Sequence, residues 1–219
     1  MKQTWRWFGP NDLVSIDDMM QAGVEGVVTA LHHRLPGEIW TAEDIAQRQR
    51  EIATRADGSA SGLTWDVVES LPVSEQIKQQ KGPWREHLNT YCRSLEALAE
   101  AGLETICYNF MPILDWTRTD LARRMPSGAT AMSFDAIDFA AYDLFILARE
   151  GAEADFEPAV LEAARERFAG MDDDRRKELV GTVTFGLPGA AQTFSLEDVR
   201  ALLAQYGAIS AEQLRSHFV

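Results

Sequence analysis

The sequence predicts an α/β fold, because short apolar segments typical of buried strands alternate with segments that have the spacing of amphipathic helices. This alternation favours parallel strands, since a parallel neighbour is reached through a crossover connection such as a helix. The composition agrees with a globular chain: of 219 residues, 46% are hydrophobic and 25% are charged. We therefore expect one domain in which helices cover a parallel sheet.

Four strands are expected, and the later ones end in polar residues after an apolar run. They cover about residues 4–9, 26–32, 63–69 and 104–110. Because helical segments lie between them, the strands should be parallel and adjacent in chain order.

The first expected helix lies within residues 11–23, where Asn11 or Ser15 can cap its N-terminus. The second helix follows Thr41, whose hydroxyl and the Asp44 carboxylate three positions later resemble a capping box. Its pattern continues to about residue 56. Both helices would connect consecutive strands.

The third expected helix covers residues 83–101 and ends at Gly102. Its apolar positions share one face and are Leu88, Tyr91, Leu95 and Leu98. A later helix begins after Ser195, a plain N-cap, and ends at Gly207.

Two architectures use this alternation, the open doubly wound sheet and the closed (β/α)8 TIM barrel. No glycine-rich phosphate loop follows the strands, which weakens the nucleotide-binding sheet. The fourth strand separates small or polar residues from bulky apolar ones. The two sets are Thr105, Cys107 and Asn109 on one face, and Ile106, Tyr108 and Phe110 on the other. This favours a partial barrel of four βα units, with the small side chains pointing inward.

Residues 113–192 interrupt the alternation and are expected to form a large, mostly helical insertion after the fourth strand. The pattern predicts a hairpin near 126–134, an apolar helix through 139–150 and a second helix through 158–171. An insertion after a barrel strand lies above the active-site mouth, where it can act as a lid or a subunit contact.

The formal charge of −13, from 34 acidic and 21 basic residues, argues against a nucleic-acid groove and against an anionic membrane surface. Two cysteines, Cys92 and Cys107, provide no disulfide framework. We expect Cys92 to be buried on a helix. Neither a leader pattern nor a long apolar run is found, so we expect a cytoplasmic protein.

Polar side chains follow the expected strands at their C-terminal ends, where barrel enzymes build their sites. The residues expected to converge there are Arg6, His32 or His33, Glu69 and Asn109. Adjacent strand residues point to opposite faces, so at most one of the two histidines can line the pocket. Glu69 could contact a ligand or form a salt bridge with Arg6, and Asn109 could be a turn residue.

Several segments, in this order and spacing, resemble the mannonate dehydratase family, whose barrel is related to that of xylose isomerase. They are TWRWFGPND (4–12), GVVTALHH (26–33), TWDVVESLPV (64–73) and CYNFMPILDWTRTDL (107–121). The likeness continues through FDAIDFAAYDLFIL (134–147) and to the end of the chain. It implies a lyase that uses iron or manganese to remove water from D-mannonate. The product would be 2-keto-3-deoxy-D-gluconate, in hexuronate (glucuronate) catabolism.

The resemblance also implies that residues 1–219 are the N-terminal part of a single TIM-barrel domain. The metal ligands and the catalytic acid and base would then lie beyond Val219. We therefore expect a fragment that is inactive alone, and assign no metal ligand within it. The substrate carboxylate would be neutralised by Arg6 or by Arg118, whose alternative is a solvated loop arginine. Trp116 could close over the sugar.

Two other functions remain open at this point. A xylose-isomerase-like isomerase or epimerase would share the barrel and the metal. A non-catalytic half-barrel used for assembly is the second alternative, and a homo-oligomer is compatible with each of them.

Overall fold

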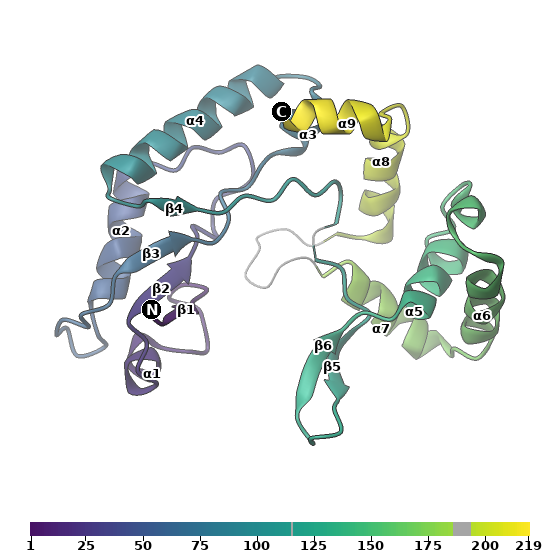
Figure 1. The fold of residues 1–219 in the computed structure, drawn as a ribbon, viewed down its shortest axis with the longest axis horizontal. Coiled ribbons are helices and arrows are strands. Elements are labelled where there is room, and N and C mark those ends of the chain that lie inside the picture. The colour runs from purple at the N-terminus through teal and green to yellow at the C-terminus, as the bar shows by residue number, and fades with distance from the viewer. Residues whose placement is uncertain (115, 186–193) are drawn as a thin grey trace. The chain divides into compact units, whose positions relative to one another are not determined.

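The structure, a computed structural model, describes residues 1–114, 116–185 and 194–219, which form two compact units (Figure 1). Unit 1 contains Met1–Pro112 and Ile209–Val219. Unit 2 contains 113–185, except residue 115, and 194–208. The last seven positions of the expected insertion, 186–192, lie outside the described residues.

Unit 1 is built on a four-stranded parallel sheet with the strand order β1-β2-β3-β4. The strands are β1 (Thr4–Arg6), β2 (Gly26–Thr29), β3 (Trp65–Val68) and β4 (Thr105–Ile106). Four parallel strands in chain order were predicted, and this arrangement is confirmed. The fold is therefore α/β with a parallel sheet.

The strands are shorter than the sequence predicts, especially β4. Backbone pairing continues beyond the ladder: Glu69 N–H donates to the Thr29 carbonyl and Cys107 N–H to the Val68 carbonyl, each at 2.9 Å, and Leu71 N–H donates to the Cys107 carbonyl at 3.0 Å. Arg6 is the last residue of β1, whereas His32, Glu69 and Asn109 lie on the backbone that follows their strands.

Buried apolar side chains from the sheet and the helices form the core of unit 1, whose described part contains five helices. They are α1 (Ile16–Gln21), α2 (Ala42–Ala53), α3 (Glu75–Gln79), α4 (Trp84–Glu100) and α9 (Ala211–Phe218). Val27, Val68, Ile45, Ile52 and Leu98 are fully buried in this core. Burying an aliphatic side chain contributes about 1.5–3 kcal/mol, so the packing of α2 and α4 stabilises the unit.

The predicted caps of the first two helices are largely confirmed. Of the two candidates for α1, Ser15 is the N-cap and forms a capping box with Asp18. Thr41 and Asp44 form the capping box of α2. Burial opposes ionisation of Asp44, but hydrogen bonds from Thr41 and Arg34 outweigh it and lower the pKa of Asp44 to about 2.

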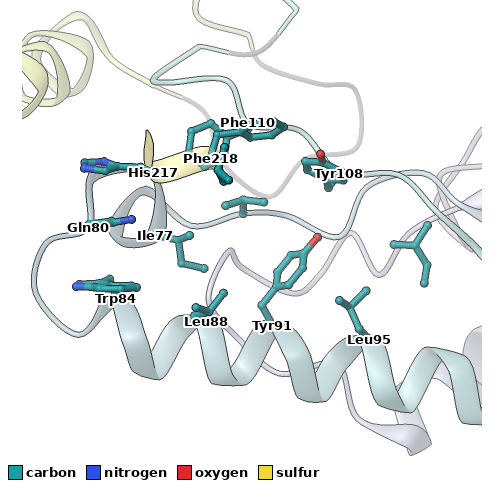
Figure 2. Close-up of a pocket in the computed structure, with 13 residues that line it drawn as sticks. Ile77, Gln80, Trp84, Leu88, Tyr91, Leu95, Tyr108, Phe110, His217 and Phe218 are labelled. Carbon is teal, nitrogen blue, oxygen red and sulfur yellow. The ribbon is translucent and has the colours of Figure 1, made fainter. Parts of the chain in front are cut away.

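The apolar face predicted for the third helix is present on α4. Leu88, Tyr91 and Leu95 of α4 line a cavity of about 530 Å³ together with Ile106, Tyr108 and Phe110. Figure 2 shows Tyr108 and Phe110 on the side of the cavity opposite α4. The alternation predicted for the fourth strand is thus confirmed for its apolar residues. α9 closes one end of the cavity. Its Phe218 ring lies 6.0 Å from that of Tyr108 and 5.2 Å from that of Phe110.

Unit 2 contains a hairpin and a group of helices packed around their own core. The elements are β5 (Asp120–Arg124), β6 (Thr130–Ser133), α5 (Ala136–Ala141), a π-helix (Tyr142–Ile146), a 3-10 helix (Ala152–Asp155), α6 (Pro158–Ala169), α7 (Asp173–Val183) and α8 (Leu196–Tyr206). β5 and β6 pair antiparallel, as the predicted hairpin requires. Helix α8 follows its predicted Ser195 cap.

Two expectations for unit 2 were incomplete. The single helix expected through 139–150 changes at Tyr142 from α to π geometry, since Leu147 N–H donates to the Tyr142 carbonyl five residues back, at 2.8 Å. Helix α7 was not predicted, because it has many charged residues and few apolar ones, so its sequence shows no clear apolar periodicity. Its buried apolar residues include Leu179 and Val183. Among the helices that the structure describes, none has the length and apolar character to cross a membrane.

Candidate functional site

An ion pair joins Arg6 and Glu69 at the C-terminal ends of β1 and β3. The Arg6 Nε donates to Glu69 Oε2 at 2.5 Å, and Nη2 donates to Oε1, so the contact is bidentate. Since β2 lies between the two strands in the sheet, the pair spans the strand that separates them. The side chains are 33% and 23% exposed, so solvent still reaches both groups.

Asn109 lies at the same edge of the sheet, beyond β4. Its Nδ2 donates to the Ser70 hydroxyl at 3.3 Å, and Ser70 directly follows Glu69. Parallel strands present their C-terminal ends on one side of the sheet. The structure therefore brings Arg6 and Glu69 into contact and places Asn109 beside the residue next to Glu69.

The two adjacent histidines have different environments. The His32 ring packs edge-on against Phe8 with 5.6 Å between centroids, and its Nδ1 is buried. The exposed His33 has its Nε2 3.8 Å from an Asp44 carboxylate oxygen, on the N-terminal turn of α2. His32 is the histidine that lies with the strand-end residues, because Arg6 also stacks on the Phe8 ring, at 5.5 Å.

His32 is uncharged at neutral pH. Burial lowers its pKa to about 4, and the positive charges of Arg48 and Arg6 act in the same direction, while Asp12 partly opposes them. Its buried Nδ1 has no hydrogen-bond partner among the residues that the structure describes. A neutral imidazole can donate one hydrogen bond and accept another, which suits recognition of a hydroxyl group.

The loop after β1 is organised by Asp12, which sequence reasoning missed. Its carboxylate accepts from the backbone N–H groups of Phe8 at 2.7 Å and Val14 at 3.0 Å. The Trp7 indole N–H donates to the Val14 carbonyl at 3.0 Å, and the buried Thr29 hydroxyl donates to the Trp7 carbonyl at 2.5 Å. These bonds fix the segment that carries the Phe8 ring against the imidazole.

Arg48 was also missed. It is only 5% exposed and lies on the buried face of α2 with Ile45 and Ile52. The helical spacing of these three positions was a usable signal, because an arginine between two core isoleucines is costly unless it has a specific environment.

Trp116 and Arg118 lie in unit 2. The Arg118 guanidinium stacks on the Trp116 ring at 5.3 Å and lies 6.0 Å from the Phe185 ring. Arg118 is only 4% exposed, so the alternative of a solvated loop arginine is wrong. Trp116 is 45% exposed. Their participation in the site of Arg6 and Glu69 stays a prediction.

The D-mannonate dehydratase (UxuA) family model matches residues 1–219. The chain belongs to this family. The mannonate dehydratase of Rhizobium meliloti (strain 1021) is 49% identical over 219 residues, which are 100% of this chain and 53% of that protein. That of Chromohalobacter salexigens is 48% identical over 217 residues, 99% of this chain and 54% of that protein.

A solved mannonate dehydratase from Streptococcus suis serotype 2 has a similar fold, with a TM-score of 0.56 and 27% identity. The match covers 100% of this chain and 52% of that chain. This chain of the mannonate dehydratase family thus spans about half the length of the relatives it matches.

The metal that the resemblance implies needs several His, Cys, Asp or Glu side chains close together. Within 1–114, 116–185 and 194–219, no group of three or more His, Cys, Asp or Glu side chains is placed to hold a metal ion. Cys92 and Cys107 are free thiols, and both are exposed. The expectation that Cys92 is buried is wrong, because it lies on the solvent side of α4 next to Arg93. These residues do not fit an iron or manganese centre by themselves.

Proposed function

We propose that this chain supplies the sugar-acid binding part of a mannonate dehydratase, a hydro-lyase that removes water from D-mannonate. The product would be 2-keto-3-deoxy-D-gluconate, in hexuronate (glucuronate) catabolism. The observation that carries the proposal is the family match over all 219 residues. The cluster of Arg6, His32, Glu69 and Asn109 at the strand ends supports it, since it combines a cation with hydrogen-bonding groups.

We further propose that β1 to β4 are the first four strands of a (β/α)8 TIM barrel. The parallel order β1-β2-β3-β4 and the similarity to the Streptococcus suis enzyme support this architecture. Residues 113–192 would then be an insertion after the fourth strand, in a position to act as a lid or as a contact in a homo-oligomer. We expect such a metabolic enzyme in the cytoplasm.

The chemistry assigns different tasks to the strand-end residues. Loss of the proton α to the carboxylate creates an enediolate, and the C3 hydroxyl then departs. Arg6 would bind the carboxylate, because a guanidinium matches its two oxygens. Glu69 would keep the guanidinium oriented and accept a hydrogen bond from a sugar hydroxyl. Neutral His32 and the Asn109 amide would bind further hydroxyl groups.

Fe²⁺ or Mn²⁺ is the cofactor that the family resemblance implies. The described residues offer no cluster for it, and we assign to them binding and orientation of the substrate. The catalytic acid and base are expected outside these residues.

The proposal is tested by making two polypeptides, residues 1–219 and a form extended to the length of the relatives. Each is loaded with Mn²⁺ or Fe²⁺, and the 2-keto-3-deoxy acid formed from D-mannonate is measured. We expect turnover by the extended form only. Turnover of D-xylose but not of D-mannonate would favour the isomerase alternative and contradict the proposal.

Arg6→Lys in the extended form tests the binding role. Lysine keeps the charge but loses the planar bidentate contact, so KM for D-mannonate should rise by about tenfold or more, in line with the 1.5–3 kcal/mol of a charged hydrogen bond. Arg50→Lys is the control, since Arg50 is on the exposed side of α2 and bonds Gln47. Equal KM values for the two variants would contradict the assignment of Arg6.

A further inference from the structure

The buried guanidinium of Arg48 calls for an explanation, because burying a charge is costly unless it is paired and hydrogen-bonded. The nearest carboxylate oxygen, Oε2 of Glu51, is 3.3 Å from Nε. Neither Nε nor Nη1 has a hydrogen-bond partner among the residues described by the structure. The charge is therefore only partly compensated, and it acts on His32 of the strand-end cluster.

Arg48 is tightly packed against the loop that follows β1. Its guanidinium lies 5.3 Å from the Trp7 ring centroid. It also touches the backbone of Gly9, where a Cβ atom would lie 2.3 Å from Nη1. Gly9 has φ +97°, so glycine is required here both by the backbone conformation and by the close approach of Arg48.

The same loop holds His32. Phe8 is the residue between Trp7 and Gly9, and its ring makes the 5.6 Å edge contact with the imidazole. A continuous set of contacts therefore leads from Arg48 through Trp7 and Gly9 to Phe8 and then to His32.

We propose that Arg48 is a positioning residue for His32: its guanidinium fixes the Trp7–Gly9 segment, so that Phe8 holds the imidazole ready to bind a ligand hydroxyl. The ligand part rests on the proposed function, whereas the control of the imidazole by Arg48 does not. Arg48 itself is too deeply buried to meet a substrate, and it acts through the loop and through its charge.

Electrostatics supports this role. The charged and titratable groups that act on His32 are Arg48 from α2, Arg6 from β1, Asp12 from the loop and the neighbouring His33. Burial is the largest cause of the lowered pKa of His32, and Arg48 is the next largest. The lowered pKa of His32 favours ligand binding, because a neutral imidazole can accept a hydrogen bond from a hydroxyl and an imidazolium cannot.

The experiment follows the His32 imidazole by NMR in residues 1–219 labelled with ¹³C and ¹⁵N at histidine. The chain has four histidines, and a His32→Asn variant assigns the signal. In Arg48→Met we expect the pKa of His32 to rise by about half a pH unit or more, because a nearby positive charge has been removed. In Arg48→Lys, which keeps the positive charge, the pKa of His32 should stay close to its wild-type value.

Arg55→Met is the matched control, since Arg55 is another arginine close to α2 but pairs with Asp17. It should leave the pKa of His32 at the wild-type value. If Arg48→Met shifts His32 no more than Arg55→Met does, or if the Met and Lys variants shift it equally, the proposal is overturned.

Gly9→Ala provides a variant in which Arg48 itself is intact. The added methyl group must displace the guanidinium, so the ring signals of His32 should shift and its pKa should rise, as in Arg48→Met. Unchanged His32 signals in folded Gly9→Ala would also overturn the proposal. All these readouts need no substrate, so they are independent of whether D-mannonate is the physiological ligand.

Discussion

The stability of unit 1 should fall between pH 7.5 and 5 because of His32. Its pKa is about 4 in the folded chain, against an ordinary value of 6.5 in the unfolded chain. Protonation therefore favours the unfolded chain. The stabilising contribution is complete above pH 6.5, decreases as the pH falls through 6.5, and is fully lost below about pH 4.

The magnitude follows from the two pKa values of His32, which differ by about 2.5. Each pKa unit corresponds to about 1.4 kcal/mol, so the whole contribution to the free energy of unfolding is about 3 kcal/mol. Between pH 7.5 and 5 the expected loss is about 2 kcal/mol, because titration in the folded state has barely begun at pH 5. Ordinary carboxylates, with pKa values of about 4, add little in this range.

Urea unfolding, followed by tryptophan fluorescence at several pH values, measures this loss. Five of the six tryptophans lie in unit 1, so the signal reports mainly on that unit. His32→Asn should remove most of the pH dependence, whereas His33→Asn, at the exposed neighbouring position, should retain it. The reasoning is refuted if wild type and His32→Asn lose the same free energy of unfolding between pH 7.5 and 5.

Two further predictions concern stability and are measured by thermal and urea unfolding. Gly9→Ala should lower the free energy of unfolding by about 1–3 kcal/mol, because of backbone strain and the clash with Arg48. Gly58→Ala should lower it by clearly less. Gly58 also has positive φ but open space around it, so equal losses would contradict the role of the contact. Asp143→Asn should destabilise unit 2 by about 1.5–3 kcal/mol, since Arg149 loses a charged hydrogen bond to a buried carboxylate and keeps its contact with Asp155. Lys177→Met, in an exposed ion pair, should change stability by less than about 0.5 kcal/mol; a comparable loss there would refute the argument.

The sequence by itself determined the order and direction of the strands in unit 1 and the starts of several helices. These features depend on local signals: apolar periodicity, the Thr41 and Asp44 capping box, and the glycine that ends α4. The alternation of Ile106, Tyr108 and Phe110 was predictable for the same reason, since neighbouring side chains in extended backbone point to opposite sides.

The sequence could not determine where the strands end or where the π-helix begins. Strand ends depend on pairing with residues that are distant in the sequence. The change at Tyr142 depends on packing of this fully buried ring in the core of unit 2. Local propensity does not contain this information, because tertiary contacts override it.

In the candidate site, too, some features are predictable from the sequence and others are set only by the tertiary structure. The sequence selected Arg6, His32 or His33, Glu69 and Asn109 because polar residues at strand ends are exceptional, and this depends on local pattern alone. The tertiary structure decided between the two histidines and formed the ion pair of Arg6 with Glu69 that the sequence left as an alternative. It also brought the buried charge of Arg48 close enough to lower the pKa of His32. The charge state of a side chain depends on its burial and on charges from other elements, and both are fixed only when the chain has folded.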